Sequence, residues 1–191
     1  MAKHVIYVPG LGDQRTYGQP VMLKFWRLFG VKAHYLALGW HSQESFDKKL
    51  ERLTSLIDEL HDKHGSVALV GVSAGATAVL NAYAAKDNID KVVCICGKIN
   101  NPQTVGQRVY EYNPPFKESV YLLQKNLNKL GSAKRAKIMS VHPLEDHTVP
   151  PADTLIDGAV ELVIPTKGHV FSIYFSIMFR ARTICRFLKN T

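Results

Sequence analysis

Short apolar segments alternate with longer amphipathic segments along most of the chain. The short segments are rich in Val and Ile, which predicts buried strands. They span residues 4–8, 31–38, 66–70, 91–99, 137–141 and 160–164. Helices are predicted between them over 20–29, 43–64 and 76–85, and a closing helix over 171–188. This alternation predicts an α/β fold with a doubly wound, mainly parallel six-stranded sheet flanked by helices.

The segment 43–64 is the longest predicted helix. Its apolar residues recur at helical spacing and would face the core; they are Phe46, Leu50, Leu53, Leu56, Ile57 and Leu60. Ser42 is the expected N-cap. His61 and His64 lie three apart on one face of this helix, where we expect them to be solvated.

The motif Gly71-Val72-Ser73-Ala74-Gly75 matches G-x-S-x-G. It lies between a predicted strand and an Ala-rich predicted helix, and a serine on such a sharp turn projects its hydroxyl above the edge of the sheet. The flanking glycines tolerate a crowded backbone. This context predicts that Ser73 is a nucleophile.

A serine hydroxyl needs a base within hydrogen-bond reach, and the base needs an acid that orients it. His169 follows the last predicted strand and is the expected base. Asp146 follows the fifth strand and is the expected acid, with Glu145 as its rival. His142 and His147 are alternative bases only under a different fold.

The oxyanion of an acyl-transfer intermediate requires backbone N–H donors. The amide of Ala74 directly follows the nucleophile, and Leu11 is the expected second donor from the glycine-rich loop after the first strand. This loop lacks both G-x-G-x-x-G and G-K-[ST], so we expect no dinucleotide or other cofactor. The chain also lacks H-E-x-x-H and a Cys/His framework, so we expect no metal.

Four segments in this order resemble the α/β-hydrolase superfamily, and specifically its small, nearly lidless serine hydrolases. They are residues 9–12, 71–75, 146–150 and 168–169. The resemblance implies that Ser73 is the nucleophile, His169 the base and Asp146 the acid. It also implies that Leu11 and Ala74 are the oxyanion donors. It also implies that the two leading strands of the family are absent, which leaves the strand order 2-1-3-4-5-6. Pro9-Gly10 stands where the family often has His-Gly.

The length of 191 residues and an ordinary composition, 46% hydrophobic and 21% charged, favour one domain over 1–191. Residues 100–135 are too long for a simple crossover loop and include a helix-like run over 117–130. They form either a small lid that lines the pocket, which we favour because long insertions are usually functional, or an enlarged crossover helix. Trp26 and Trp40 are expected to be packing residues. Trp40, at the end of the second strand, is also a candidate for the pocket rim, as are Tyr110, Tyr112 and Phe116 of the long segment.

The formal net charge is +8. The Lys and Arg residues are dispersed and no nucleic-acid motif is present, so no nucleic-acid partner is expected. The start of the chain has no signal-peptide pattern, and the apolar stretch 171–179 is too short to span a bilayer, so we expect a cytoplasmic protein without an integral membrane segment. The closing helix is strongly apolar, and apolar surface in excess of what the core needs could form a homodimer contact or touch a membrane.

Cys94 and Cys96 lie two apart on one predicted strand and would point to the same face, which is poor geometry for a disulfide. We therefore expect them, and Cys185, to be reduced core thiols. The expected function is hydrolysis of small carboxylic esters through an acyl-enzyme. A thioesterase, lactonase, amidase or acyltransferase on the same triad, and a non-catalytic binding protein on the same fold, are the alternatives.

Overall fold

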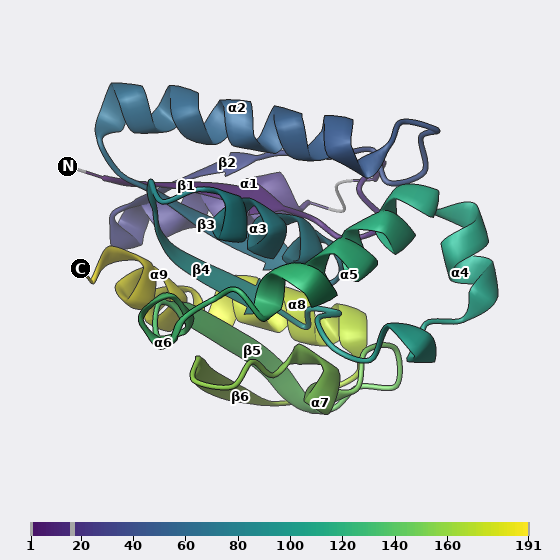
Figure 1. Ribbon diagram of the computed structural model, residues 1–191. Coiled ribbons are helices and arrows are strands. Elements are labelled where there is room, and N and C mark those ends of the chain that lie inside the picture. The colour runs from purple at the N-terminus through teal and green to yellow at the C-terminus, as the bar shows by residue number, and fades with distance from the viewer. Residues whose placement is uncertain (1, 16–17, 191) are drawn as a thin grey trace.

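A six-stranded, all-parallel sheet lies at the centre of the computed structural model, which describes residues 2–15 and 18–190 (Figure 1). The strands are β1 (Lys3–Val8), β2 (Val31–Tyr35), β3 (Val67–Val72), β4 (Ile89–Ile95), β5 (Ile138–Glu145) and β6 (Val160–Lys167). Their order is β2-β1-β3-β4-β5-β6, which confirms the predicted fold class and strand order. All five strand pairs are parallel.

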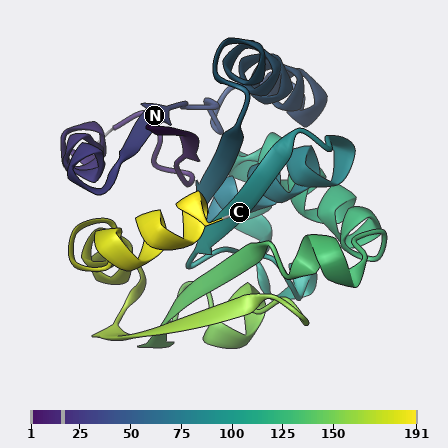
Figure 2. The same ribbon diagram turned by 90° about the vertical axis from the view of Figure 1, so that its left-hand side faces the viewer.

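Helices cover both faces of the sheet (Figure 2). One face carries α2 (Phe46–His64), α3 (Ala74–Ala85) and α5 (Pro114–Leu127), and the other carries α1 (Gln19–Lys24), η1 (Phe25–Phe29), α8 (His169–Phe179) and α9 (Ala181–Lys189). The central strands are therefore buried on both faces, which is why they are almost continuously apolar rather than alternating. Shorter helices complete the chain: η2 (Pro102–Thr104), α4 (Gln107–Tyr112), α6 (Ser132–Arg135) and α7 (Pro151–Thr154).

The predicted closing helix over 171–188 is two helices, α8 and α9, which meet at Arg180 (φ −106°, ψ 6°). The break has a tertiary cause. Trp26 of η1 donates its indole N–H to the carbonyl of Ile177 at 2.9 Å. That carbonyl is the one that Ala181 would need to continue a single helix. The predicted helix over 20–29 is likewise divided, into α1 and the 3₁₀ helix η1.

The start of α2 also differs from the prediction. The helix begins at Phe46, and Ser45 rather than Ser42 occupies the N-cap position. The hydroxyl of Ser42 instead accepts a hydrogen bond at 2.5 Å from the ammonium of Lys49, which is completely buried. Lys49 also donates to the carbonyl of Gly39 at 2.7 Å. This lysine thus ties the loop after β2 to α2.

The predicted common face of Cys94 and Cys96 is wrong. Cys94 packs on the α2/α3 side of the sheet and Cys96 on the α8/α9 side. Because β4 ends at Ile95 and Cys96 has a positive φ of 48°, strand alternation does not reach Cys96. Both thiols and that of Cys185 are free and buried, as predicted.

The segment 100–135 packs mainly as part of a helical layer. Its helix α5 lies against α3, and the ring of Phe116 meets that of Trp40 edge-on at a centroid distance of 6.0 Å. Ser119 and Thr77 join the two helices by a buried hydrogen bond of 2.7 Å between their hydroxyls. Among the described residues, no helix is both long and apolar enough to cross a membrane.

Candidate active site

Ser73 lies on the turn between β3 and α3, at the carboxyl edge of the sheet. Its backbone is strained, with φ 52° and ψ −118°, a conformation that residues with a Cβ rarely adopt. The amide of Ser73 donates to the carbonyl of Ile95 at 2.9 Å, so the neighbouring strand holds the turn. Backbone strain of this kind concentrates at functional sites, where the surrounding structure holds it.

The glycines on either side of Ser73 are required for close packing rather than for a positive φ. A Cβ on Gly71 would lie 2.5 Å from a methyl group of Val79, and a Cβ on Gly75 would lie 2.1 Å from the carbonyl oxygen of Val8. Real Cβ contacts are never so short. The motif therefore allows the start of α3 to touch the end of β1.

His169 is the first residue of α8 and connects Ser73 to Asp146. Its Nε2 is 2.9 Å from Oγ of Ser73, and its Nδ1 is 2.6 Å from Oδ2 of Asp146. An ionised carboxylate only accepts hydrogen bonds, so it holds the proton of the ring on Nδ1 and leaves Nε2 to accept from the serine. The three side chains form one continuous chain of hydrogen bonds.

The carboxylate of Asp146 is buried and well supplied with donors. Its Oδ1 accepts from the amides of Thr148 at 2.8 Å and Val149 at 3.0 Å. Burial alone would raise the pKa of Asp146, but the hydrogen bonds from His169 and from these two amides outweigh it, so the pKa lies below its usual range. The side chain is therefore an anion at neutral pH.

The rival residues lie elsewhere. Glu145 is half-exposed and pairs with Lys167 at 2.6 Å. His142 is buried and pairs with Glu161 of β6 at 2.8 Å, and His147 is exposed. Of the two histidines of α2, His64 is exposed, as expected, and its ring stacks on that of His4 at a centroid distance of 3.6 Å. His61 is half-buried, and its buried Nδ1 has no hydrogen-bond partner in the described part of the chain.

A cavity of about 540 Å³ opens beside Ser73. Its lining residues are Pro9, Gly10, Leu11, Gly12, Arg15, Gln19, Tyr35, Val72, Ser73, Thr148, His169, Val170, Ile173 and Tyr174. These residues come from the loop after β1, the start of α1, the end of β2, the G-x-S-x-G motif, the loop after β5 and α8. None of these lining residues belongs to the segment 100–135.

The aromatic residues proposed for the pocket rim take other positions. Trp40, Tyr110 and Phe116 are buried in the core, and Tyr112 is exposed on α4. Trp40 instead supports the site from behind, because its indole N–H donates to the carbonyl of Pro9 at 3.2 Å. Tyr35 is a lining residue that sequence reasoning missed. Its place at the carboxyl end of a strand was an available signal.

The loop after β1 is held at both ends next to Ser73. Trp40 holds its first residue, and the buried Asp13 accepts from the amide of Gly39 at 2.6 Å. Between these points Leu11 lines the cavity. Ala74 is the first residue of α3, and the first N–H groups of a helix have no partner inside it. Leu11 and Ala74 therefore lie on the two backbone segments that border Ser73.

Cys96 is a further neighbour of the site. The potential ligand atoms of Cys96, Asp146 and His169 lie within 4.8 Å of one another. Burial, and secondarily the charge of Asp146, raise the pKa of the Cys96 thiol well above its usual value, whereas a metal binds the thiolate. The pairing of Asp146 with His169 favours proton transfer over metal binding by this group.

Similar proteins are found by structure and not by sequence. No protein-family model and no curated protein sequence matches the chain. The α/β hydrolase GrgF from Penicillium superposes with a TM-score of 0.70 at 14% identity, over 98% of this chain and 89% of that one. An esterase of Pyrococcus furiosus superposes with a TM-score of 0.69 at 17% identity, over 98% of this chain and 80% of the esterase. A monoacylglycerol lipase of Paleococcus ferrophilus superposes with a TM-score of 0.64 at 12% identity, over 97% of this chain and 93% of the lipase.

Proposed function

We propose that this chain, which has the α/β-hydrolase fold, is a serine hydrolase that cleaves small carboxylic esters. The observation that carries the proposal is the chain of hydrogen bonds from Ser73 through His169 to Asp146, at 2.9 and 2.6 Å. A base within reach of the hydroxyl and a buried anion behind the base are what a serine nucleophile requires.

In the proposed reaction His169 takes the proton of Ser73 on Nε2 as Oγ attacks the acyl carbonyl carbon. The carbonyl π-bond opens and its electron pair moves to the oxygen. When the tetrahedral intermediate collapses, the C–O bond to the alcohol breaks and His169 gives its proton to the leaving oxygen. Water then attacks the acyl-enzyme with the same base, and Ser73 and a carboxylic acid are released.

The amides of Leu11 and Ala74 are the proposed donors to the oxyanion. Their segments border the serine on two sides, and the firm hold on Pro9 and Asp13 would keep one donor in place before substrate binds. Donors fixed in advance stabilise the developing charge without a cost of reorganisation. A loop anchored in this way supports that role.

The cavity supports a small, largely apolar acyl group. A volume of about 540 Å³ is within the usual range for small-molecule sites. Leu11, Ile173 and Val170 supply apolar wall, and Tyr35 and Tyr174 add aromatic surface. The names of two structural neighbours, an esterase and a monoacylglycerol lipase, agree with carboxylic esters as the substrate class.

The test is turnover of p-nitrophenyl acetate and butyrate by the wild type and by Ser73→Ala. We expect saturable release of p-nitrophenol by the wild type and a loss of at least about 1,000-fold in kcat/KM in the variant, with an unchanged circular dichroism spectrum. Matching thioester, lactone and anilide substrates measure the bond preference. Equal turnover by Ser73→Ala would refute the proposal.

A further inference from the structure

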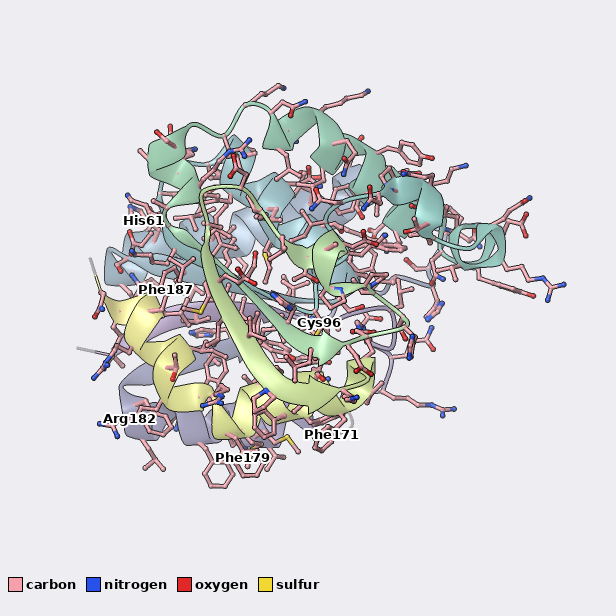
Figure 3. All side chains as sticks on the ribbon, turned by 90° about the horizontal axis from the view of Figure 1, so that it is seen from below. His61, Cys96, Phe171, Phe179, Arg182 and Phe187 are labelled. Carbon is pink, nitrogen blue, oxygen red and sulfur yellow. The ribbon has the colours of Figure 1, made fainter. Side chains whose placement is uncertain are left out.

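The outer faces of α1, η1 and α8 expose a patch of large apolar side chains. The apolar patch consists of Val21, Phe25, Leu28, Val170, Phe171, Met178 and Phe179. Leu28 is 80% exposed and Phe179 is 74% exposed. Helix α1 packs against α8, and the bond from Trp26 to Ile177 joins η1 to α8. Figure 3 shows Phe171 and Phe179 projecting from α8 away from the sheet along the same edge of the molecule.

The apolar patch is not needed to fill the core. The inward faces of the same helices already bury Leu23, Trp26, Ile173 and Ile177 against the sheet. Single exposed apolar residues are ordinary, but a cluster of this kind on a monomer is typical of a binding surface. The ring of Phe175, half-buried, lies between those of Phe171 and Phe179, at 6.2 and 5.2 Å between centroids, and makes the α8 part continuous.

The segments that carry the apolar patch also carry most of the excess positive charge of the chain. The segments 18–30 and 168–190 contain six of the 24 Lys and Arg residues and none of the 16 Asp and Glu residues, so six of the eight excess charges lie here. These cations are Lys24, Arg27, Arg180, Arg182, Arg186 and Lys189. Within the described residues, none of them forms a salt bridge. The five exposed cations, all but Arg180, are available to an anionic partner. The guanidinium of Arg180 lies over the ring of Phe175 at 5.7 Å.

Apolar and basic side chains meet in a hollow between η1 and α9. The hollow has a volume of about 550 Å³, and its walls are Leu28, Phe29 and Gly30 on one side and Arg182, Arg186, Lys189 and Asn190 on the other. Figure 3 places Arg182 beside the edge from which Phe179 projects. An exposed leucine next to three cations fits a ligand with an apolar part and an anionic headgroup.

The apolar patch also reaches the mouth of the candidate active site. Val170 belongs to the patch, is 65% exposed and lines the cavity beside Ser73. It directly follows His169 in the chain. An acyl chain that leaves a lipid layer under this face would meet apolar side chains along its path to the nucleophile.

We propose that this face docks on an anionic phospholipid membrane, with the apolar patch in the headgroup and acyl boundary and the cations on the lipid phosphates. Apolar area and positive charge together are the combination that binds such surfaces. A second copy of the chain fits less well, because a twofold interface would oppose like charges. The further statement that the enzyme takes its esters from the membrane rests on the proposed function.

Cosedimentation of the full chain with vesicles of phosphatidylglycerol, compared with vesicles of phosphatidylcholine, tests the docking. We expect binding to the anionic vesicles that weakens as salt is added. Arg182→Gln with Arg186→Gln should lower the affinity about 30-fold, since each cation near an anionic surface contributes about fivefold. The matched control, Lys48→Gln with Lys125→Gln, removes two exposed cations from α2 and α5 on the opposite face and should bind as the wild type.

The role of the apolar patch is tested by the double variant Leu28→Ser with Phe179→Ser. The control is the double variant Tyr112→Ser with Leu144→Ser, which replaces two exposed apolar residues outside the patch. The first pair should lose vesicle binding, keep the turnover of soluble p-nitrophenyl acetate and lose hydrolysis of an ester carried in the vesicles. The control pair should lose none of these. All four positions are exposed, so the substitutions leave the core unchanged, and circular dichroism checks the fold of each variant.

Three results would overturn the docking proposal: no binding of the wild type to phosphatidylglycerol, equal binding by the variants, or a dimer in light scattering that Leu28→Ser with Phe179→Ser dissociates while vesicles stay unbound. Vesicle binding does not depend on Ser73. Binding without any ester hydrolysis would therefore contradict the proposed function alone, and hydrolysis of soluble esters without binding would contradict the docking alone.

Discussion

Gly75 lies so close to Val8 that a Cβ on the glycine would stand 2.1 Å from the carbonyl oxygen of Val8 and 2.6 Å from that of Pro9. The first turn of α3 therefore rests directly on the end of β1. This contact sets Ala74 and the loop of Leu11 around the same serine. One close approach of two backbones thus builds both sides of the proposed oxyanion site.

Gly75→Ala is expected to destabilise the protein by about 3 kcal/mol or more, because the two backbones cannot yield without moving α3 off β1. Chemical denaturation measures the effect. Gly106→Ala is the matched control, since a Cβ there would have nothing within 4 Å and the glycine has an ordinary φ of −57°. The control should change the stability by less than about 1 kcal/mol. Similar effects of the two substitutions would contradict the packing described.

The strained backbone of Ser73 predicts a stability difference between two inactive variants. Ser73→Gly should be more stable than Ser73→Ala by about 1 kcal/mol, because glycine adopts a positive φ without strain. The difference is smaller than the full strain energy, since glycine also has more conformational freedom in the unfolded chain. Thermal denaturation of the two variants side by side gives the difference. If Ser73→Ala were the more stable, the conformation at this turn would not be the strained one.

Asp146→Asn is expected to lower kcat/KM by about 1,000- to 10,000-fold, because an amide can donate to Nδ1 and stabilise the wrong tautomer of His169. Hydrogen bonds keep the pKa of Asp146 below its usual range, so the wild-type carboxylate is ionised from about pH 6 to pH 9 and the loss should be present at every pH in this range. Ester turnover across this range measures it.

Glu145→Gln is the control for that substitution, because it removes the neighbouring carboxylate. Glu145 pairs with Lys167 at the surface, so its loss should change kcat/KM by less than about threefold. A larger effect of Glu145→Gln than of Asp146→Asn would exchange the roles of the two acids.

The stability of the fold is expected to depend on pH through His4, near the start of β1. Its ring stacks on that of His64, and its Nδ1 lies 3.1 Å from Nε2 of His34. Burial lowers the pKa of His4 from 6.5 to about 4, and the charges of His64 and His34 add to the shift. A group with a lowered folded-state pKa stabilises the fold fully above its unfolded pKa. We therefore expect stability to fall between pH 6.5 and 4, by up to about 1.4 kcal/mol per pH unit.

Urea denaturation at several pH values tests this expectation on wild type, His4→Gln and the control His41→Gln, which replaces an exposed histidine of the loop after β2. His4→Gln should flatten the decline between pH 6.5 and 4, whereas His41→Gln should leave it unchanged. Equal slopes in all three proteins would show that the folded-state pKa of His4 is not lowered.

Much of the fold and of the candidate site could be predicted because local chemistry carries them. Six apolar segments separated by amphipathic ones indicate a covered parallel sheet, and the structure has it. Ser73, Asp146 and His169 each follow a strand, and parallel strands bring their carboxyl ends to one edge. The sequence order of these residues therefore implied their meeting in space, which the structure places within hydrogen-bond distance.

The features that could not be predicted depend on tertiary contacts. The break at Arg180 follows from Trp26, 151 residues from its acceptor Ile177, and no Gly or Pro marks it. Nothing in the local sequence distinguishes Lys49 from a surface lysine. It is buried because the fold brings the carbonyl of Gly39 within hydrogen-bond distance of its ammonium group. Cys96 changes face because the strand ends one residue before it, and strand ends are poorly marked in sequence.

Ser73 is proposed to be an activated nucleophile, and labelling with a fluorophosphonate probe is the decisive experiment. The adduct would be mapped by mass spectrometry on the wild type, on Ser73→Ala and on Asp146→Asn. We expect one label per chain at Ser73, none in Ser73→Ala and much slower labelling in Asp146→Asn. Well-folded wild-type protein that takes no label, or takes it at another residue, would show that Ser73 is not an activated nucleophile.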